Sequence, residues 1–190
     1  DDFRKRLLHG RERLMQMLPL PEKGGTLMDM GGGTGSNIEA LGKRIQNLDH
    51  VEIVDLCESL LEIAKERIES NQWTNVRAVC ADATKYTPIS TPDAITFSYS
   101  LTMIPDWFTV IDKAFESLKP GGIIGVVDFY VSRKWPDQGM KKHSAWTRGF
   151  LPAWFSYDNV FLSPEHLPYL MKKFHPIMIE EWRGTVPYIP

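Results

Sequence analysis

The sequence predicts an α/β fold in which a mostly parallel sheet is covered by helices on both faces. Short apolar segments typical of strands alternate along the chain with longer segments whose apolar residues recur every three or four positions. Consecutive parallel strands need helical crossovers between them, so this alternation favours a parallel sheet. The chain has 190 residues, which is enough for one domain with a substantial core.

Seven segments are expected to be strands. Five of them alternate with the predicted helices: 27–30, 51–55, 76–80, 93–98 and 123–129. The last two, 177–182 and 185–189, are separated by Arg183 and Gly184, which is typical of a tight turn between antiparallel strands. The sheet is therefore expected to end in an antiparallel pair at one edge.

Five helices are expected around these strands: 4–18, 37–45, 58–70, 105–118 and 163–174. The third of them has one apolar stripe, formed by Leu60, Leu61, Ala64 and Ile68. The last begins with Ser163 as its N-cap and Pro164 in its first turn. These apolar stripes are interpreted as core.

A glycine-rich loop directly after the first strand is the most informative motif. Asp29, Gly31, Gly33 and Gly35 occupy alternate positions, and Ser36 opens the next helix. Glycines let the backbone turn sharply here and leave no side chain over a ligand. Such a loop usually holds a nucleotide-like cofactor against backbone N–H groups and a helix N-terminus.

Two acidic residues support a nucleoside cofactor. Asp55 ends the second strand, about twenty residues after Gly35, where a carboxylate can accept both ribose hydroxyls. Asp82 follows the third strand. A nicotinamide-dependent dehydrogenase normally spaces its glycines Gly-x-Gly-x-x-Gly, whereas the third glycine of this loop comes one position too early. A dehydrogenase and a glycine turn that binds nothing are therefore the less favoured alternatives.

The whole pattern resembles the class I S-adenosylmethionine-dependent methyltransferases over essentially the full chain. The resemblance is carried by Asp29, the three alternating glycines, Asp55, Asp82 and the run Lys119-Pro120-Gly121-Gly122. It implies a Rossmann-like, seven-stranded, mostly parallel sheet with an antiparallel C-terminal edge strand. It also implies S-adenosyl-L-methionine as the cofactor.

The same resemblance implies a role for each residue of the cofactor site. The glycines would face the methionine part of the cofactor, Asp55 would hold the ribose, and Asp82 with Ala83 would lie beside the adenine. Leu56 and Ser98, at the ends of the second and fourth strands, are also expected to contact the cofactor. The methyl group of a sulfonium is already activated, so the protein mainly aligns the acceptor and excludes water.

The composition of the chain limits the kinds of protein that it could be. The formal net charge is −2, and the five histidines have no spacing typical of a metal site, so a metal-free enzyme is expected. Cys57 and Cys80 are expected to be reduced, buried thiols. The start of the chain lacks a signal peptide and no apolar run could span a membrane. Because the first residue is Asp1, we expect an excerpt from a longer, multidomain chain.

The segment between the fifth strand and the last helix combines aromatic and basic residues. The aromatic residues are Trp135, Trp146, Phe150, Trp154, Phe155, Tyr157 and Phe161, and the basic ones are Arg133, Lys134, Lys141, Lys142 and Arg148. An insertion at this place normally builds the acceptor pocket. The mixture suits nucleic acid or a membrane–water interface, and the net charge argues against nucleic acid. A lid with its own small core is the alternative.

Four longer strings give a closer resemblance. Residues 148–169, 182–190, 100–107 and 129–132 are similar to the methyltransferase part of betaine-lipid synthases. This resemblance implies three N-methylations that convert diacylglycerylhomoserine into its trimethylated betaine lipid. It further implies a fused or partner domain that transfers an aminocarboxypropyl group to diacylglycerol, at the cytoplasmic face of an internal membrane such as the endoplasmic reticulum.

Several polar residues lie where the acceptor should enter. Tyr99, Tyr130 and His143 are the candidate catalytic residues, with Asp128 as a further polar group nearby. The two tyrosines come first because a ring face tolerates a cationic ammonium. Arg148 or Arg183 could pair with the carboxylate of a homoserine headgroup. The sequence around Tyr99 lacks the Asn/Asp-Pro-Pro-aromatic element of nucleobase methyltransferases.

The expected organisation is a single methyltransferase domain over residues 1–190. It comprises an N-terminal helix and linker (1–25), a cofactor-binding core (26–130), the aromatic and basic insertion (131–162), and a closing helix and hairpin (163–190). Peripheral membrane contact through residues 133–161 is expected. Two alternatives remain open: a methyltransferase for a quinone, a sterol or a soluble amine, and a catalytically silent cofactor-binding scaffold.

Overall fold

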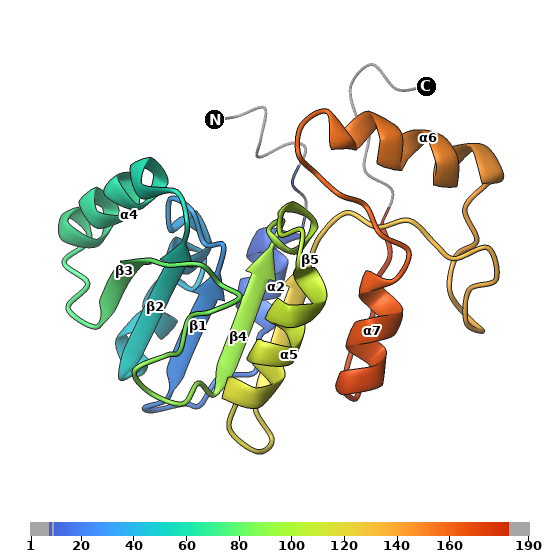
Figure 1. The fold of residues 1–190 in the computed structure, drawn as a ribbon. Helices are drawn as coiled ribbons and strands as arrows, with labels where there is room; N and C mark the ends of the chain where they lie inside the picture. The colour runs from blue at the N-terminus through green and yellow to red at the C-terminus, as the bar shows by residue number, and fades with distance from the viewer. Residues whose placement is uncertain (1–7, 9, 183–190) are drawn as a thin grey trace.

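The computed structural model describes residue 8 and residues 10–182. Five strands form one sheet in the order β3-β2-β1-β4-β5 (Figure 1). They are β1 (Thr26–Met30), β2 (His50–Asp55), β3 (Val76–Cys80), β4 (Ala94–Ser98) and β5 (Ile123–Val127). All four neighbouring pairs are parallel. The predicted α/β class is therefore confirmed, as are all five core strands.

The strand order determines where a ligand can bind. The chain first builds outward from β1 through β2 to β3, and it then returns to place β4 on the other side of β1. The connections that leave β1 and β4 therefore run in opposite directions and open a crevice beyond the carboxyl ends of these two strands. Ligands of open parallel sheets bind at such a switch point.

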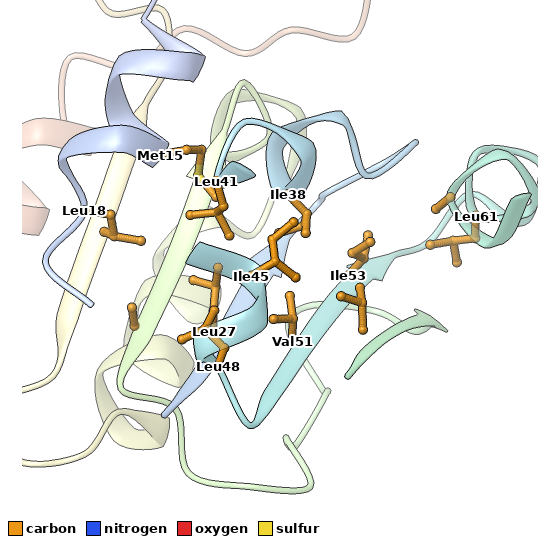
Figure 2. Packing of buried hydrophobic residues seen from close by; sticks show 13 residues of the cluster. Met15, Leu18, Leu27, Ile38, Leu41, Ile45, Leu48, Val51, Ile53 and Leu61 are labelled. Carbon is orange, nitrogen blue, oxygen red and sulfur yellow. The ribbon is translucent and has the colours of Figure 1, made fainter. Parts of the chain in front are cut away.

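Helices cover both faces of the sheet. One face packs against α2 (Arg11–Met17), α3 (Ser36–Glu39), the 3-10 segment η1 (Gly42–Asn47) and α4 (Glu58–Ser70). Figure 2 shows this cluster, in which Leu27, Val51 and Ile53 from the strands meet helical residues. The other face carries α5 (Trp107–Ser117) and α7 (His166–Lys173).

The alternation of side chains explains how each strand supplies both faces. In β1, Leu27 belongs to the first cluster, whereas Met28 and Met30 belong to the second. Successive residues of a strand point to opposite faces, so a strand covered on both sides is apolar throughout. Each fully buried side chain of this size contributes about 1.5–3 kcal/mol to the free energy of unfolding.

The segment after β5 forms a smaller unit beside the sheet. It contains α6 (Ala145–Ser156), which begins with Ser144 accepting a hydrogen bond from the Thr147 N–H. Val131, Phe155 and Leu162 form a small buried cluster of their own beneath α6. In Figure 1, α6 lies at the end of the molecule toward which the strand arrows point. One side of α6 therefore fits the alternative prediction for this segment, a lid with its own small core.

Several predicted boundaries need correction. The expected helix 37–45 is split into α3 and η1, because Gly42 adopts a left-handed φ of +56° that does not fit an α-helix. The fifth strand ends at Val127 and not at Phe129, since the Phe129 N–H donates to the carboxylate of Asp128. In the helix expected over 4–18, α2 begins only after Gly10; residues 1–7 and 9 lie outside the described residues.

The predicted antiparallel edge is the largest difference. Residues 177–182 do not form a strand, and 185–189 lie outside the described residues. Side-chain contacts hold the first of these segments instead. Arg13 donates to both carboxylate oxygens of Glu180, at 2.9 and 2.6 Å, and Tyr130 donates to Glu181 at 2.7 Å. The described part of the sheet thus has five strands where seven were expected.

Two smaller expectations concern the cysteines and the membrane. Cys57 and Cys80 are free, but both are exposed, so the prediction of buried thiols is wrong. Cys57 is the N-cap residue of α4, and Cys80 is the last residue of the edge strand β3, so neither lies inside the core. Within the described residues, no helix combines the length and the apolar character needed to cross a membrane.

Candidate functional site

The glycine loop joins β1 to α3 at the switch point of the sheet. Its backbone is fixed from one side, because Gly31 and Gly32 donate their N–H groups to the carbonyl of Val54 in β2, at 2.7 and 3.2 Å. Gly31, Gly33 and Gly35 all have positive φ angles, of +68°, +52° and +72°. The three glycines predicted from the motif are therefore the positions at which the loop turns.

Gly31 and Gly33 differ in the space beside their backbone. A Cβ added to Gly31 would lie 2.4 Å from the Cβ of Ser100, so the loop after β1 and the loop after β4 meet here. A Cβ on Gly33 would have only Leu60 and Asp55 atoms near it, at 3.6 and 3.8 Å. These are ordinary van der Waals distances, so this side of Gly33 has room for a ligand group, and its positive φ is what favours glycine here.

Asp55 lies at the carboxyl end of β2, next to this open side of the loop. Its two oxygens accept the N–H groups of Gly33 and Cys57, each at 2.8 Å. A carboxylate oxygen can accept more than one hydrogen bond, so Asp55 retains capacity for the two hydroxyls of a ribose. The carboxylate thus connects the glycine loop with the start of α4.

The residues predicted to surround an adenine follow the next strands. Asp82 accepts from the hydroxyl and the N–H of Thr84, at 2.7 and 3.0 Å, and the hydrogen bonds from Thr84 lower the pKa of Asp82. Ala83 is partly buried against the second core cluster. Leu56 is 72% exposed directly after β2. An apolar side chain with this exposure is available to contact a ligand.

Asp29, which the resemblance includes among the cofactor-binding residues, lies beneath the glycine loop. It is fully buried beneath the loop and accepts from Thr96 at 2.7 Å and from Asn37 at 3.0 Å. Burial raises the pKa of Asp29, and these hydrogen bonds oppose the effect. Its observed contacts tie β1, β4 and α3 together under the glycines. A direct contact between Asp29 and the cofactor stays a prediction.

The end of β4 forms the opposite wall of the crevice. Ser98 is buried, and its hydroxyl has no hydrogen-bond partner among the described residues. Tyr99 follows with a left-handed φ of +53°, which is uncommon for a bulky residue and costs on the order of 1–2 kcal/mol. Strained backbone of this kind concentrates at functional sites. Ser100 then donates to the carbonyl of Met30, at 2.7 Å.

The ring of Tyr99 has a cation over it and an aromatic edge against it. The guanidinium carbon of Arg11, at the start of α2, lies 5.2 Å from the Tyr99 ring centroid. The ring of Phe129 packs edge-on at 4.8 Å. Burial, and after it the negative charge of Asp128, raise the pKa of Tyr99 to about 12. Tyr99 is therefore a neutral phenol at physiological pH.

Asp128 is a positioning residue whose contacts the sequence did not reveal. Its carboxylate accepts the hydroxyl of Thr102 at 2.7 Å and the N–H groups of Thr102 and Phe129, at 3.0 and 2.8 Å. Burial raises the pKa of Asp128, and the hydrogen bonds from Thr102 oppose it. This carboxylate fixes the loop after β4 against the end of β5. The sequence indicated Asp128 only as a polar residue at the end of the fifth predicted strand.

Tyr130 and His143 lie together, apart from the Tyr99 contacts. Their ring centroids are 5.3 Å apart. Tyr130 donates to Glu181, and burial together with this hydrogen bond raises the pKa of Tyr130. Burial lowers the pKa of His143, whose Nδ1 accepts the N–H of Ser132 at 2.9 Å. The neutral ring of His143 then carries its hydrogen on Nε2.

Arg148 and Lys141 are two cations close enough to His143 to influence its pKa. Arg148 lies in α6, and its positive charge contributes to lowering the pKa of His143. The Nε of Arg148 is buried and has no hydrogen-bond partner among the described residues. A buried, unsatisfied guanidinium N–H suits an anionic ligand group. Arg183, the other predicted candidate for a carboxylate, lies outside the described residues.

The assembled site fits a sulfonium nucleoside. The backbone of Gly33, the carboxylates of Asp55 and Asp82, and the buried hydroxyl of Ser98 lie at or just after the carboxyl ends of the neighbouring strands β1, β2, β3 and β4. In contrast, a hollow lined by Leu20, Pro21, Glu22, Arg44 and Asn47 lies at the opposite end of the sheet, where β1 and β2 begin. Across residues 10–182, no cluster of three or more His, Cys, Asp or Glu side chains could hold a metal ion.

Comparison with known proteins gives a family match. Residues 9–160 match the ubiE/COQ5 methyltransferase family. The demethylmenaquinone methyltransferase of Bacillus licheniformis is 29% identical over 113 residues, which are 59% of this chain and 47% of that protein. The ubiquinone/menaquinone biosynthesis C-methyltransferase of Hydrogenovibrio crunogenus is 29% identical over 108 residues, 56% of this chain and 42% of that protein. The chain thus spans about half the length of these curated relatives.

Solved structures show the same fold. A putative methyltransferase of Bacillus halodurans superposes with a TM-score of 0.67 at 21% identity, covering 86% of this chain and 67% of that one. Phosphoethanolamine N-methyltransferase 2 of Haemonchus contortus, solved with S-adenosyl-L-methionine, gives 0.67 at 19% identity, covering 86% and 36%. At these identities the likeness establishes the Rossmann-like methyltransferase fold and nothing finer.

Proposed function

We propose that this chain, which belongs to the ubiE/COQ5 methyltransferase family, transfers methyl groups to an amine nitrogen in a lipid headgroup. The acceptor proposed is diacylglycerylhomoserine, and the product after three transfers is its trimethylated betaine lipid. Family membership confirms two coarser predictions, namely a methyltransferase domain and S-adenosylmethionine as its cofactor. The acceptor, by contrast, is argued from the site and from the resemblance of the C-terminal strings.

The observation that carries the proposal is the cation over the Tyr99 ring. The guanidinium of Arg11 lies 5.2 Å from the ring centroid, so the ring attracts a cation, and a substrate ammonium would take the place of this guanidinium. Successive N-methylations convert an amine into a quaternary ammonium, which offers no N–H to donate. A ring face can stabilise such a cation without a hydrogen bond. Tyr99 lies at the carboxyl end of β4, beside the cofactor loop.

The residues of the site have separate tasks in this reaction. The backbone of the glycine loop, Asp55 and Asp82 would hold S-adenosylmethionine. When bound, this cofactor supplies a methyl group on an already activated sulfonium. Tyr99 would orient the amine with its ring, while Asp128 fixes the loop after β4. Alignment and exclusion of water then do most of the catalytic work.

Proton removal is the step for which a second group is needed. An amine near pH 7 is mostly protonated, and its proton must leave before the nitrogen can attack. Tyr99 is a poor base because its phenol already carries a proton at this pH. The Nδ1 of His143 is occupied by the Ser132 N–H, so His143 would have to turn its ring to accept a proton. The catalytic roles of Tyr130 and His143 stay predictions, and water is the proposed proton acceptor.

Arg148 supports an acceptor that carries a carboxylate. Its buried Nε lacks a partner among the described residues, near the Tyr130 and His143 pair. Homoserine in a lipid headgroup has a carboxylate beside the amine, and a guanidinium binds such a group strongly. We propose that Arg148 holds this carboxylate. The partner domain that would make the headgroup, an aminocarboxypropyltransferase, stays a prediction.

The curated relatives favour a second candidate. Two of them are named as methyltransferases of menaquinone or ubiquinone biosynthesis, and this chain covers about half of each. A quinone acceptor would be methylated at carbon and would leave no cation in the site. The aromatic contacts of Tyr99 with Phe129 could also pack against a quinone ring.

One assay separates these functions. The chain is incubated with methyl-labelled S-adenosylmethionine and vesicles that contain either diacylglycerylhomoserine or demethylmenaquinone. Label in the homoserine lipid, lost in Asp55→Ala, is the expected result. Label in the quinone alone would replace our proposal with the second candidate. No transfer to either acceptor, in a protein that binds the cofactor in a calorimeter, would identify a silent scaffold.

A further inference from the structure

An exposed row of aromatic side chains runs along α6. Trp146, Phe150 and Trp154 are spaced four residues apart, so they lie on one side of the helix. The rings of Trp146 and Phe150 stack at 4.5 Å, and those of Phe150 and Trp154 are 5.6 Å apart. Trp146 is 57% exposed and Trp154 47%. We call these three residues the α6 ridge.

The other side of α6 is already occupied. Phe155 is buried with Val131 and Leu162, and Leu151 packs against the same cluster. A helix whose opposite sides are both apolar, but of which only one is covered, has a second surface left to bury. The α6 ridge is therefore not needed for the small core of this segment.

Basic side chains gather around Trp135 in the segment just before α6. We call Trp135, Lys134 and Lys142 the Trp135 lobe. Trp135 is 72% exposed, and the Nζ atoms of Lys142 and Lys134 lie 4.2 and 5.6 Å from its ring centroid. Between residues 131 and 150 the sequence has five Lys or Arg residues and one acid, Asp137. Only Arg133 among these cations forms an ion pair with a described acid, Glu165.

We propose that the α6 ridge and the Trp135 lobe dock the enzyme on a bilayer that contains anionic lipid. Tryptophan prefers the headgroup layer of a membrane, and lysines near an anionic surface are attracted to it. A second copy of the chain fits less well, because a two-fold interface would place the same positive lobes against each other. The negative net charge of the chain disfavours nucleic acid.

The place of α6 in the fold gives this docking a consequence. Figure 1 shows α6 at the end of the molecule toward which the strands point, the end that carries the glycine loop. Tyr99, Phe129 and Phe155 form a chain of ring contacts from the end of β4 to α6. A docked enzyme would thus turn its crevice toward the membrane. This inference goes beyond the proposed function, because it holds for a homoserine lipid and for a quinone.

Vesicle co-sedimentation tests the proposal. The whole chain is mixed with vesicles of phosphatidylcholine alone or with added phosphatidylglycerol, and the expected result is binding that depends on the anionic lipid. The double variant Lys134→Glu/Lys142→Glu should weaken binding about 30-fold or more, since each lysine near the surface contributes about five-fold. Trp146→Ala/Trp154→Ala should weaken it at least tenfold on both kinds of vesicle.

Matched controls use equally exposed residues elsewhere. Ile63→Ala/Phe108→Ala removes two apolar side chains, 44% and 48% exposed, on α4 and α5. Lys43→Glu/Lys65→Glu reverses two exposed charges on η1 and α4. Both controls should bind vesicles like the wild type. All variants should keep the wild-type affinity for S-adenosylhomocysteine, which separates lost docking from a damaged cofactor site.

Three outcomes would overturn the proposal. The first is a wild-type protein that remains in solution with both kinds of vesicle. The second is a Trp146→Ala/Trp154→Ala variant that binds as tightly as the wild type. The third is a dimer in analytical ultracentrifugation that the same variant dissociates, because a second copy would then cover the ridge.

Discussion

The region from β1 to β4 and the segment around α6 are built in different ways. In residues 26–98, the functional positions follow from the backbone, since each lies at the end of a strand or at a glycine with positive φ. In residues 131–162, side chains distant in sequence hold the structure, as when Arg133 pairs with Glu165 and Tyr130 with Glu181. The proposed cofactor site thus depends on the backbone of the first region, whereas the proposed acceptor side depends on side-chain contacts of the second.

We expect the two regions to differ most in how much a substitution in the core lowers the free energy of unfolding. Phe97 is fully buried in the second cluster of the sheet, and Phe97→Ala should lower the free energy of unfolding by about 3–5 kcal/mol. Phe155 is the matched residue in the α6 segment, where only three buried side chains meet. Phe155→Ala should cost less, because a small cluster can collapse around the gap. Urea denaturation followed by circular dichroism measures both, and equal losses would contradict the difference.

The hydrogen bonds beneath the glycine loop should have the next largest effect. Asp29→Ala leaves the hydroxyl of Thr96 and the amide of Asn37 without their acceptor in a fully buried place. The expected loss is about 1–3 kcal/mol in the same denaturation experiment. Asp49→Ala is the control, since its carboxylate accepts one long, exposed hydrogen bond from Gly25. If the two variants were equally stable, Asp29 would not support the loop.

We expect the free energy of unfolding to depend on pH through His166, which lies at the contact between α7 and α5. It is buried against Trp107, its ring nitrogens have no partner in the described part of the chain, and burial lowers its pKa to about 4. The unfolded chain binds this proton near pH 6.5. Stability from neutral His166 is therefore complete above pH 6.5 and is lost as the pH falls toward 4, by at most about 1.4 kcal/mol per pH unit.

Urea midpoints measured between pH 4 and pH 7.5 test the effect of His166. His166→Phe should flatten this part of the profile, because phenylalanine keeps the ring contact with Trp107 and has no proton to bind. His175→Phe, at an exposed position just after α7, should leave the profile unchanged. An unaltered slope in His166→Phe would contradict the assignment.

The smallest expected effect concerns the ring of Tyr99. Tyr99→Leu removes the face that would hold an ammonium, and kcat should fall roughly 2- to 30-fold, the range of a cation–π interaction. Tyr99→Phe keeps the ring and should stay within a few-fold of the wild type. The labelled-methyl assay with the homoserine lipid measures both. A loss in Tyr99→Phe as large as in Tyr99→Leu would assign the role to the hydroxyl.

The sequence predicted the first region well, for a physical reason. Five strands and the helix Glu58–Ser70 lie where the apolar periodicity placed them, and Gly31, Gly33 and Asp55 lie together at the switch point. These features are local, because a turn that needs positive φ or a strand that needs two apolar faces is visible in neighbouring residues. The buried hydrogen bonding of Asp29 could not be predicted from its neighbours, because its partner Thr96 lies far along the chain.

The second region could not be predicted to the same depth. Nothing local indicated that residues 177–182 would be held by ion pairs and hydrogen bonds to Arg13 and Tyr130 instead of strand pairing. The partition of the α6 side chains into a buried side with Phe155 and an exposed ridge also depends on where Val131 and Leu162 return. Contacts between distant segments decide both features, and local patterns in a single sequence do not reveal such contacts.

We expect Asp55 and the glycine loop to bind a sulfonium nucleoside. Isothermal titration calorimetry with S-adenosylhomocysteine tests this binding on the wild type, on Asp55→Ala and on Glu62→Ala, a change at an exposed position of α4. We expect one site in the wild type, the same affinity in Glu62→Ala, and about 100-fold weaker binding in Asp55→Ala, which loses charge-assisted hydrogen bonds. A wild type that releases no heat, or an Asp55→Ala variant that binds equally well, would contradict the account.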